Sequence, residues 1–146
     1  MPLVRLIYFS HRNEDVTIDE IEKILEVSRK NNRGKNITGI LCFHQNYFFQ
    51  VLEGRRAAVC HLYNKIAKDP RHSNVTISDF REVPNREFSD WNMAYFPESK
   101  ITTPDILAHS CDDDLNLDEM RTESIIKLIL SFKERIPEAQ TAGAIK

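Results

Sequence analysis

The chain has 146 residues, with 20 basic and 22 acidic side chains and a formal net charge of −2 at pH 7. This length fits one domain with an extension, and the balanced charge gives no general attraction to nucleic acid or to an anionic membrane. Three cysteines at wide, irregular spacings predict neither a disulfide framework nor a zinc site, and they indicate a reducing compartment. The N-terminus does not resemble a signal peptide, and no apolar run approaches the ~20 residues of a membrane span. We therefore expect a cytoplasmic protein with no direct nucleic-acid or membrane partner.

The first two thirds of the chain predict the element order β-α-β-β-α-β, followed by one more short strand. Alternating or continuous apolar runs predict strands at residues 3–10, 37–43, 47–53, 75–83 and 91–96. A capping box formed by Thr17 and Glu20 begins the first helix, and Gly34 is expected to end it. The second helix is expected over residues 55–68 and ends before Pro70.

This order is typical of an α+β fold, the ferredoxin-like βαββαβ sandwich with an additional fifth strand. Right-handed crossovers place both helices on one face of the sheet, which leaves a groove between them as a candidate ligand site. We expect two parts, a compact domain at residues 1–97 and a C-terminal helical extension at residues 98–146.

The extension is expected to contain helices at 104–110 and 117–135 and a disordered tail from Pro137. The second of these helices has an apolar stripe from Ile125 to Phe132. This stripe either packs on the open face of the sheet or mediates self-association, and the sequence leaves both alternatives open.

Gln50 is a polar residue inside the strongest strand-like run of the chain, residues 47–52. Its amide has donors and an acceptor that need partners if they are buried, and leaving them unpaired costs roughly 1–3 kcal/mol. Tyr8 lies on a strand that neighbours this run in the expected topology, so the two side chains are candidates for a hydrogen bond. A polar neighbour or a polar ligand is therefore expected beside Gln50.

Other polar residues lie near the same expected groove. Asn31 and Asn32 continue the buried stripe of the first helix, which is compatible with a simple helix end or with amides that bind a planar ligand. The turn after the second helix carries Asp69, Arg71 and His72 at one end of the groove, and Lys65 lies one helical turn earlier. The histidines and cysteines lack ligand spacing, so no metal site is predicted. No phosphate-binding glycine loop or nucleophile motif is present, and we expect a protein that is not an enzyme.

Six fragments in order resemble the BLUF family of blue-light sensors that use FAD. They are LIYFS (6–10), SRKNN (28–32), ITG (37–39), FFQVLEG (48–54), DPRH (69–72) and FSDWNM (88–93). The resemblance covers roughly residues 2–97, and the short extension is similar to that of short-type members, in which helices follow the sensor.

The resemblance implies FAD bound between the two helices. It assigns Asn31 and Asn32 to the pyrimidine end of the isoalloxazine, with Asn32 nearer, and Lys65 to the phosphate. The full set of implied flavin-binding positions is Ile24, Ser28, Arg29, Asn31, Asn32, Gln50, Lys65, Ile66, Asp69, Arg71 and His72.

The resemblance also implies a photochemical role for Tyr8 and Gln50. Light drives electron and proton transfer from Tyr8 through Gln50, and the rearranged hydrogen bonds to the flavin shift its absorption to the red. Trp91 and Met93, expected to alternate on the fifth strand and so to share a face, relay the signal to the extension.

The expected partners are flavin, a second copy of the chain in a homo-oligomer, and a downstream protein of response-regulator or other type. Two alternatives stay open from the residues alone: a flavin-dependent redox enzyme, and a ferredoxin-like binding module with no cofactor.

Overall fold

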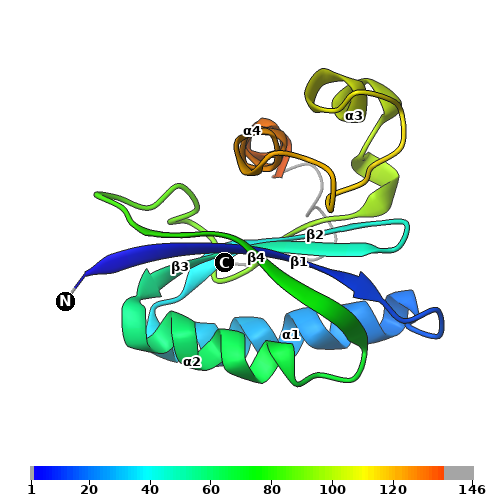
Figure 1. Cartoon of the computed structure of the whole chain (residues 1–146). Helices are drawn as coiled ribbons and strands as arrows, with labels where there is room; N and C mark the ends of the chain where they lie inside the picture. Colours follow the sequence, from blue (N-terminus) through cyan, green and yellow to red (C-terminus); the bar gives the residue numbers. More distant parts are fainter. Residues whose placement is uncertain (1, 137–146) are drawn as a thin grey trace.

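The computed structural model describes residues 2–136, and the tail expected to be disordered lies outside them. A single five-stranded sheet separates two pairs of helices (Figure 1). The strands are β1 (Leu3–Arg12), β2 (Thr38–His44), β3 (Tyr47–Arg55), β4 (His72–Glu82) and β5 (Ala94–Phe96). The helices are α1 (Ile18–Lys35), α2 (Arg56–Ala67), α3 (Thr103–His109) and α4 (Thr122–Phe132), with short 3₁₀ turns η1 (Glu98–Lys100) and η2 (Lys133–Arg135).

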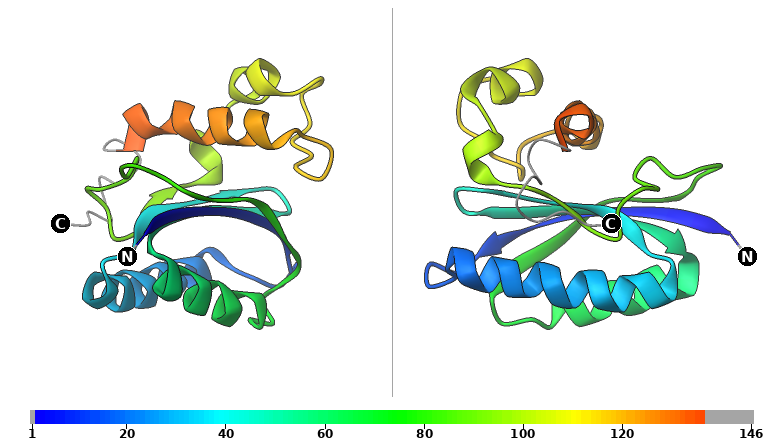
Figure 2. Two further views of the ribbon diagram at one scale, coloured as in Figure 1. Left: turned by 60° about the vertical axis from the view of Figure 1, so that its left-hand side comes forward. Right: turned by 180° about the vertical axis from the view of Figure 1, so that it is seen from behind.

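The strand order β4-β1-β3-β2-β5 confirms the ferredoxin-like arrangement with an added fifth strand. Pairing is antiparallel between neighbours from β4 to β2, and β5 joins the edge of β2 in parallel. Helices α1 and α2 lie together on one face of the sheet, and α3 and α4 lie on the other (Figure 2). None of the helices among the described residues is long and apolar enough to cross a membrane.

Both faces of the central strands are buried, which explains why their sequences read as continuous apolar runs. Leu6, Tyr8 and Leu52 face α1 and α2, whereas Ile7 and Val51 face the opposite side. Alternation along each strand therefore supplies two cores, one for each pair of helices.

Helix α1 begins as expected but ends later than its glycine suggested. The Thr17 hydroxyl accepts a hydrogen bond from the Glu20 backbone N–H at 3.2 Å. The expected end at Gly34 is wrong, because Asn36 adopts the left-handed conformation at φ 55° and its N–H donates to the Asn32 carbonyl. Asparagine tolerates this backbone conformation well enough to replace glycine at a helix C-terminus.

The apolar stripe of α4 packs on the open face of the sheet. Ile125, Leu128, Ile129 and Phe132 are all buried, and the Phe132 ring stacks on Phe96 of β5 at 4.2 Å between centroids. This contact decides between the two alternatives for the stripe in favour of packing. The helix begins at Thr122 rather than at 117, because the preceding residues form a turn that inserts Leu117 into the same core.

The fifth strand is shorter than expected and starts at Ala94 instead of residue 91. The Trp91 carbonyl accepts a hydrogen bond from the Gly39 N–H at 3.1 Å, but residues 91–93 form no strand. The prediction that Trp91 and Met93 alternate on one strand face is therefore wrong. Met93 is fully buried on the side of α1 and α2, whereas Trp91 packs against the core beneath α4.

Candidate functional site

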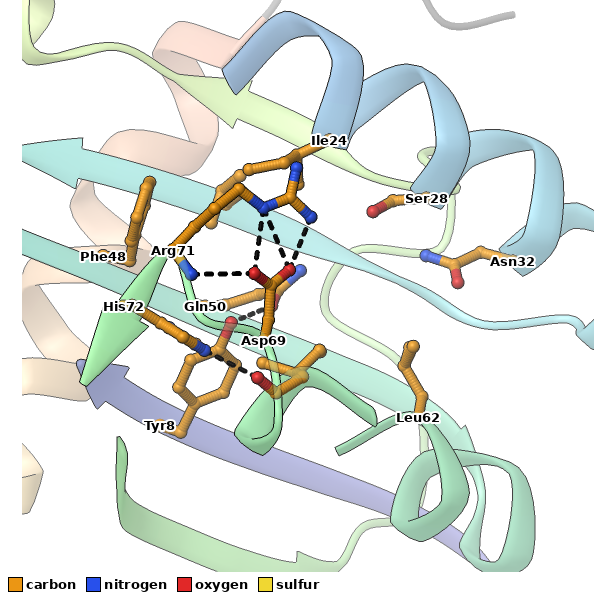
Figure 3. A pocket seen from close by; sticks show the side chains of 12 residues that line it. Tyr8, Ile24, Ser28, Asn32, Phe48, Gln50, Leu62, Asp69, Arg71 and His72 are labelled. Carbon is orange, nitrogen blue, oxygen red and sulfur yellow. Dashed lines mark hydrogen bonds and ion pairs between the residues drawn. The ribbon is translucent and has the colours of Figure 1, made fainter. Parts of the chain in front are cut away.

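A pocket opens between α1 and α2, with the sheet as its floor (Figure 3). About 510 Å³ of space there is free of protein atoms, a volume that includes the part open to solvent. Its lining residues are Tyr8, Ile24, Ser28, Asn32, Leu41, Phe48, Gln50, Leu62, Ile66, Asp69, Arg71 and His72.

At the floor of the pocket, Tyr8, Gln50 and Met93 form one chain of hydrogen bonds. Tyr8 and Gln50 are directly opposite each other on β1 and β3, and the Tyr8 hydroxyl donates to Gln50 Oε1 at 2.5 Å. Gln50 Nε2 donates to the Met93 sulfur at 3.2 Å. These partners define the amide orientation, with its oxygen toward the phenol and its nitrogen toward the thioether.

The Tyr8 phenol is held in its neutral form. Burial raises its pKa far above the ordinary value, and the nearby Tyr63 and the Asp69 carboxylate raise it further. The edge of the Tyr63 ring lies against Tyr8, with 5.9 Å between ring centroids. Tyr8 therefore enters any reaction as a protonated phenol, able to donate a hydrogen bond at all physiological pH values.

Helix α1 attaches the residues before β5 to the pocket wall. The Asn32 amide nitrogen donates to the Asn92 carbonyl at 3.0 Å, and Arg29 Nε donates to the Met93 carbonyl at 3.1 Å. Ser28 lies between Ile24 and Asn32 on the pocket side of the helix (Figure 3). The polar end of α1 thus serves both the pocket and the segment that carries Met93.

The turn after α2 forms a charged rim around the pocket. Asp69 accepts hydrogen bonds from the Arg71 side chain and backbone, and these bonds hold the pKa of the Asp69 carboxyl below its usual value. His72 Nε2 donates to the Ile66 carbonyl at 2.6 Å, since a carbonyl only accepts. In the neutral ring, Nδ1 then accepts from the Ser10 hydroxyl at 2.7 Å.

Three of the residues expected to bind flavin are not among the lining residues of this pocket. Asn31 and Lys65 are exposed, whereas Arg29 is half-buried and donates to the Met93 carbonyl. Ile24 of α1 and Ile66 of α2 both line it, from opposite helices.

Sequence reasoning missed the apolar part of the wall and one buried acid. Leu41, Phe48 and Leu62 line the pocket, but their types are ordinary for core positions and gave no signal. Glu53 is fully buried at the end of β3, outside the pocket. The argument that singled out Gln50, a polar group in a buried strand, applies equally to Glu53 and identifies it in the same run.

The residues of the pocket fit a flavin ring. Aliphatic walls from both helices and aromatic side chains of the sheet suit a flat tricyclic body. The buried amides of Asn32 and Gln50 can pair with a ring edge that presents carbonyl and N–H groups. Arg71 and His72 at the rim add cationic or hydrogen-bonding groups for the polar side chain of such a ligand.

Comparison with known proteins identifies the class. Residues 3–94 match the family model BLUF, described as sensors of blue-light using FAD. The chain belongs to the BLUF family, a class of flavin-dependent blue-light sensors, and its cofactor is FAD. The family match sets aside the alternative of a cofactor-free binding module.

Two curated relatives illustrate the range of proteins that contain this domain. The chain is 34% identical over 113 residues to the blue light- and temperature-regulated antirepressor BluF of Escherichia coli (strain K12), covering 77% of this chain and 26% of that protein. It is 30% identical over 102 residues to photoactivated adenylate cyclase subunit beta of Euglena gracilis, covering 69% and 12%. The chain thus spans about a quarter or less of the length of these relatives.

Solved structures match over nearly the whole chain. The photo-activated state of BlsA superposes with a TM-score of 0.79 at 27% identity, covering 99% of both chains. The dark state of BlrB, described as a BLUF protein, gives a TM-score of 0.74 at 30% identity, covering 89% of this chain and 96% of that one.

Proposed function

We propose that this chain is a photoreceptor in which the Tyr8–Gln50 pair converts absorbed blue light into a new hydrogen-bond arrangement. The observation that carries the proposal is the buried chain from the Tyr8 hydroxyl through the Gln50 amide to the Met93 sulfur. When bound, FAD supplies absorption of blue light and an excited state that accepts an electron.

Tyr8 is the electron and proton donor in this proposal. Its hydroxyl proton already points at Gln50 Oε1, so loss of an electron from the phenol makes that proton acidic and delivers it to the amide. The amide can accept a proton on oxygen and release one from nitrogen toward the bound cofactor, which would hold the electron and the proton only briefly. When both return, Tyr8 is again a neutral phenol and Gln50 alone is left in a different orientation or tautomer. The changed Gln50 donors and acceptors are then the stored record of the light signal.

The remaining predicted positions hold the cofactor in this proposal. Ile24 and Ile66 pack against the two faces of the ring, and Ser28, Arg29, Asn31 and Asn32 serve its polar edge from α1. Asp69, Arg71 and His72 act at the rim, with Lys65 toward the phosphate. The pocket lining supports most of this set, whereas the exposure of Asn31 and Lys65 favours contacts outside the ring pocket for these two.

The output of the sensor is binding rather than turnover. We propose that residues 1–97 sense light and residues 98–146 present the result to a second copy of the chain or to a separate effector protein. Some relatives carry the domain in larger proteins, such as the adenylate cyclase of Euglena gracilis. Light-independent oxidation or reduction of a substrate by this chain would contradict the proposal.

The proposal is tested by absorption spectra of the flavin-loaded full chain before and after blue light. We expect a small red shift that reverses in darkness, and its loss in Tyr8→Phe with flavin still bound. Tyr63→Phe is the matched control, because Tyr63 lies beside Tyr8 but makes no hydrogen bond to Gln50 among the contacts described. Permanent bleaching, or loss of the shift in the control alone, contradicts the role of Tyr8.

A further inference from the structure

The segment between β4 and β5 delivers Met93 to Gln50 but has no strand of its own over residues 83–93. It connects the two edge strands of the sheet, because β4 and β5 lie at opposite ends of the strand order. Phe88 is buried in the core beneath α4, whereas Met93 is buried on the side of α1 and α2, so the segment passes from one face of the sheet to the other. Its position depends on individual hydrogen bonds rather than on a ladder.

Glu53 provides the densest group of these hydrogen bonds. Its carboxylate accepts from the backbone N–H of Glu87 at 2.9 and 3.0 Å and from that of Phe88 at 2.8 Å. Arg5 Nε donates to the same carboxylate at 2.9 Å. Glu53 is fully buried, and a buried carboxylate is tolerated only where charged and backbone donors satisfy it, as they do here.

The same region is attached at further points. Arg86 donates to the Thr38 hydroxyl at 2.7 Å and to the Glu53 carbonyl at 3.0 Å. Glu87 pairs through its side chain with Lys133 Nζ at 3.2 Å, immediately after α4. Together, Glu53, Arg86 and Glu87 form an anchor. This anchor connects β3, the segment that carries Met93, and the C-terminal helices.

Glu53 is close to Gln50 in sequence but faces the other way. Gln50 points into the pocket, whereas Glu53, three residues along β3, belongs to the opposite face and lines no part of the pocket. Any effect of Glu53 on the flavin site must therefore act through the segment it holds.

We propose that Glu53 is a positioning residue of the sensor, whose buried carboxylate fixes residues 87–88 and thereby fixes the Met93 sulfur against the Gln50 amide. This inference rests on the proposed function and extends it. Loosening the anchor frees Met93 to leave Gln50, which changes how firmly each Gln50 arrangement is held and so how long the light-induced state lasts.

The test uses Glu53→Gln in the flavin-loaded full chain. An amide at this position keeps the shape but turns one acceptor oxygen into a donor that faces Arg5 or a backbone N–H. Glu82→Gln is the matched control, because Glu82 makes a single ion pair with Arg56 on the exposed surface. Two measurements are made: hydrogen exchange over residues 84–93 in darkness, and the rate of dark recovery after blue light.

We expect exchange of the Glu87 and Phe88 amides to rise at least about tenfold in Glu53→Gln, since a charge-assisted bond to each is weakened. Dark recovery should change by at least about threefold at unchanged flavin content, with neither value altered in Glu82→Gln. Faster exchange with unchanged recovery overturns the positioning role, because the anchor is then only structural. If amide exchange is unchanged in Glu53→Gln, the Glu53 carboxylate does not hold residues 87–88, and the proposal is also overturned.

If Glu53→Gln does not fold or does not bind flavin, Arg86→Met replaces it as the test variant. Arg86→Met loosens the same segment at its exposed end. It should therefore change the exchange rate and the recovery rate in the same direction as Glu53→Gln, but by a smaller factor. Recovery that stays at the unaltered rate in Arg86→Met despite faster exchange again overturns the proposal. If the unaltered chain shows no reversible red shift, the proposed function fails, while hydrogen exchange still reports on the anchor.

Discussion

Gln50 lies between one strong and one weak hydrogen-bond partner. Its oxygen accepts from the Tyr8 phenol at 2.5 Å, whereas its nitrogen donates to the Met93 thioether, a weak acceptor. The amide is therefore held mainly from the Tyr8 side. A change in the protonation of Tyr8 removes the stronger of the two contacts and leaves the Gln50 amide free to reorient. For this reason we assign the switching role to Gln50.

The raised pKa of Tyr8 gives a prediction for alkaline stability. A group whose pKa is raised by folding contributes stability that is complete below its unfolded value of about 10 and is lost as the pH rises above that value. The free energy of unfolding of the unaltered chain should therefore fall more steeply between pH 9 and 11 than that of Tyr8→Phe. Denaturant unfolding at several pH values measures the difference, and parallel curves for the two proteins would contradict the assignment.

The pair Asn31 and Asn32 allows a second test at this scale. Asn32→Ala removes the bond to the Asn92 carbonyl and one of the two buried pocket amides, so we expect a loss of about 1 kcal/mol in stability and clearly weaker flavin retention. Asn31→Ala changes the exposed neighbour and should alter stability by less than about 0.5 kcal/mol. Flavin content after gel filtration and denaturant unfolding provide the measurements. Equal loss of flavin in both variants would mean that Asn31 contacts the ring as directly as Asn32.

Comparison of the predicted strands and helices with those of the structure shows which elements can be predicted from the sequence. Helix α1, the β2–β3 hairpin and α2 follow from periodicity and turn residues, because their stabilising contacts are local or repeat along the chain. The strands predicted at 75–83 and 91–96 leave residues 84–90 as a loop, as the structure shows, but residues 91–93 form no strand. These residues are held by Gly39 and Asn32 from distant positions, which no local sequence pattern reveals. Their misassignment to the fifth strand produced the wrong expectation that Trp91 and Met93 share a face.

Replacing two glycines by alanine should change stability in opposite directions, although the two residues lie in neighbouring elements. A Cβ on Gly39 of β2 would overlap the Val51 carbonyl oxygen of β3, so Gly39→Ala should separate the strands and lower stability by more than about 2 kcal/mol. Gly34 lies inside α1 with open space around the same position, so Gly34→Ala should raise stability by roughly 0.5–1 kcal/mol. Denaturant unfolding measures both, and destabilisation by Gly34→Ala would contradict the helical assignment of that residue.

At the scale of the whole molecule, the two faces of the sheet have different neighbours. One face and the pair α1 and α2 form the pocket proposed to bind flavin, and the other face is covered by α4 (Figure 1). Gln50 and Glu53 face opposite sides of the same strand, so β3 contributes to both. The sequence predicted the sheet order and the pocket face, but it left the position of α4 open, because an amphipathic stripe does not specify which apolar surface it covers.

The packing of α4 predicts that residues 1–97 are not independent of the extension. A chain that ends at Pro97 exposes the sheet face that contacts Leu128, Ile129 and Phe132, and should lose more than about 4 kcal/mol of stability. Dye binding to exposed apolar surface, together with denaturant unfolding, measures this. A truncated chain that stays monodisperse with unchanged stability would contradict the packing and would favour a separate output module.

The direct test of the central claim is the amide NMR spectrum of Gln50 in darkness and under blue light. The chain contains three glutamines, so selective ¹⁵N labelling of their side chains gives few signals, and the one absent from Gln50→Leu is assigned to Gln50. We predict that illumination shifts the Gln50 signal reversibly and leaves the other two unchanged, and that the shift disappears in Tyr8→Phe. A reversible red shift of the flavin with a stationary Gln50 signal would contradict the account.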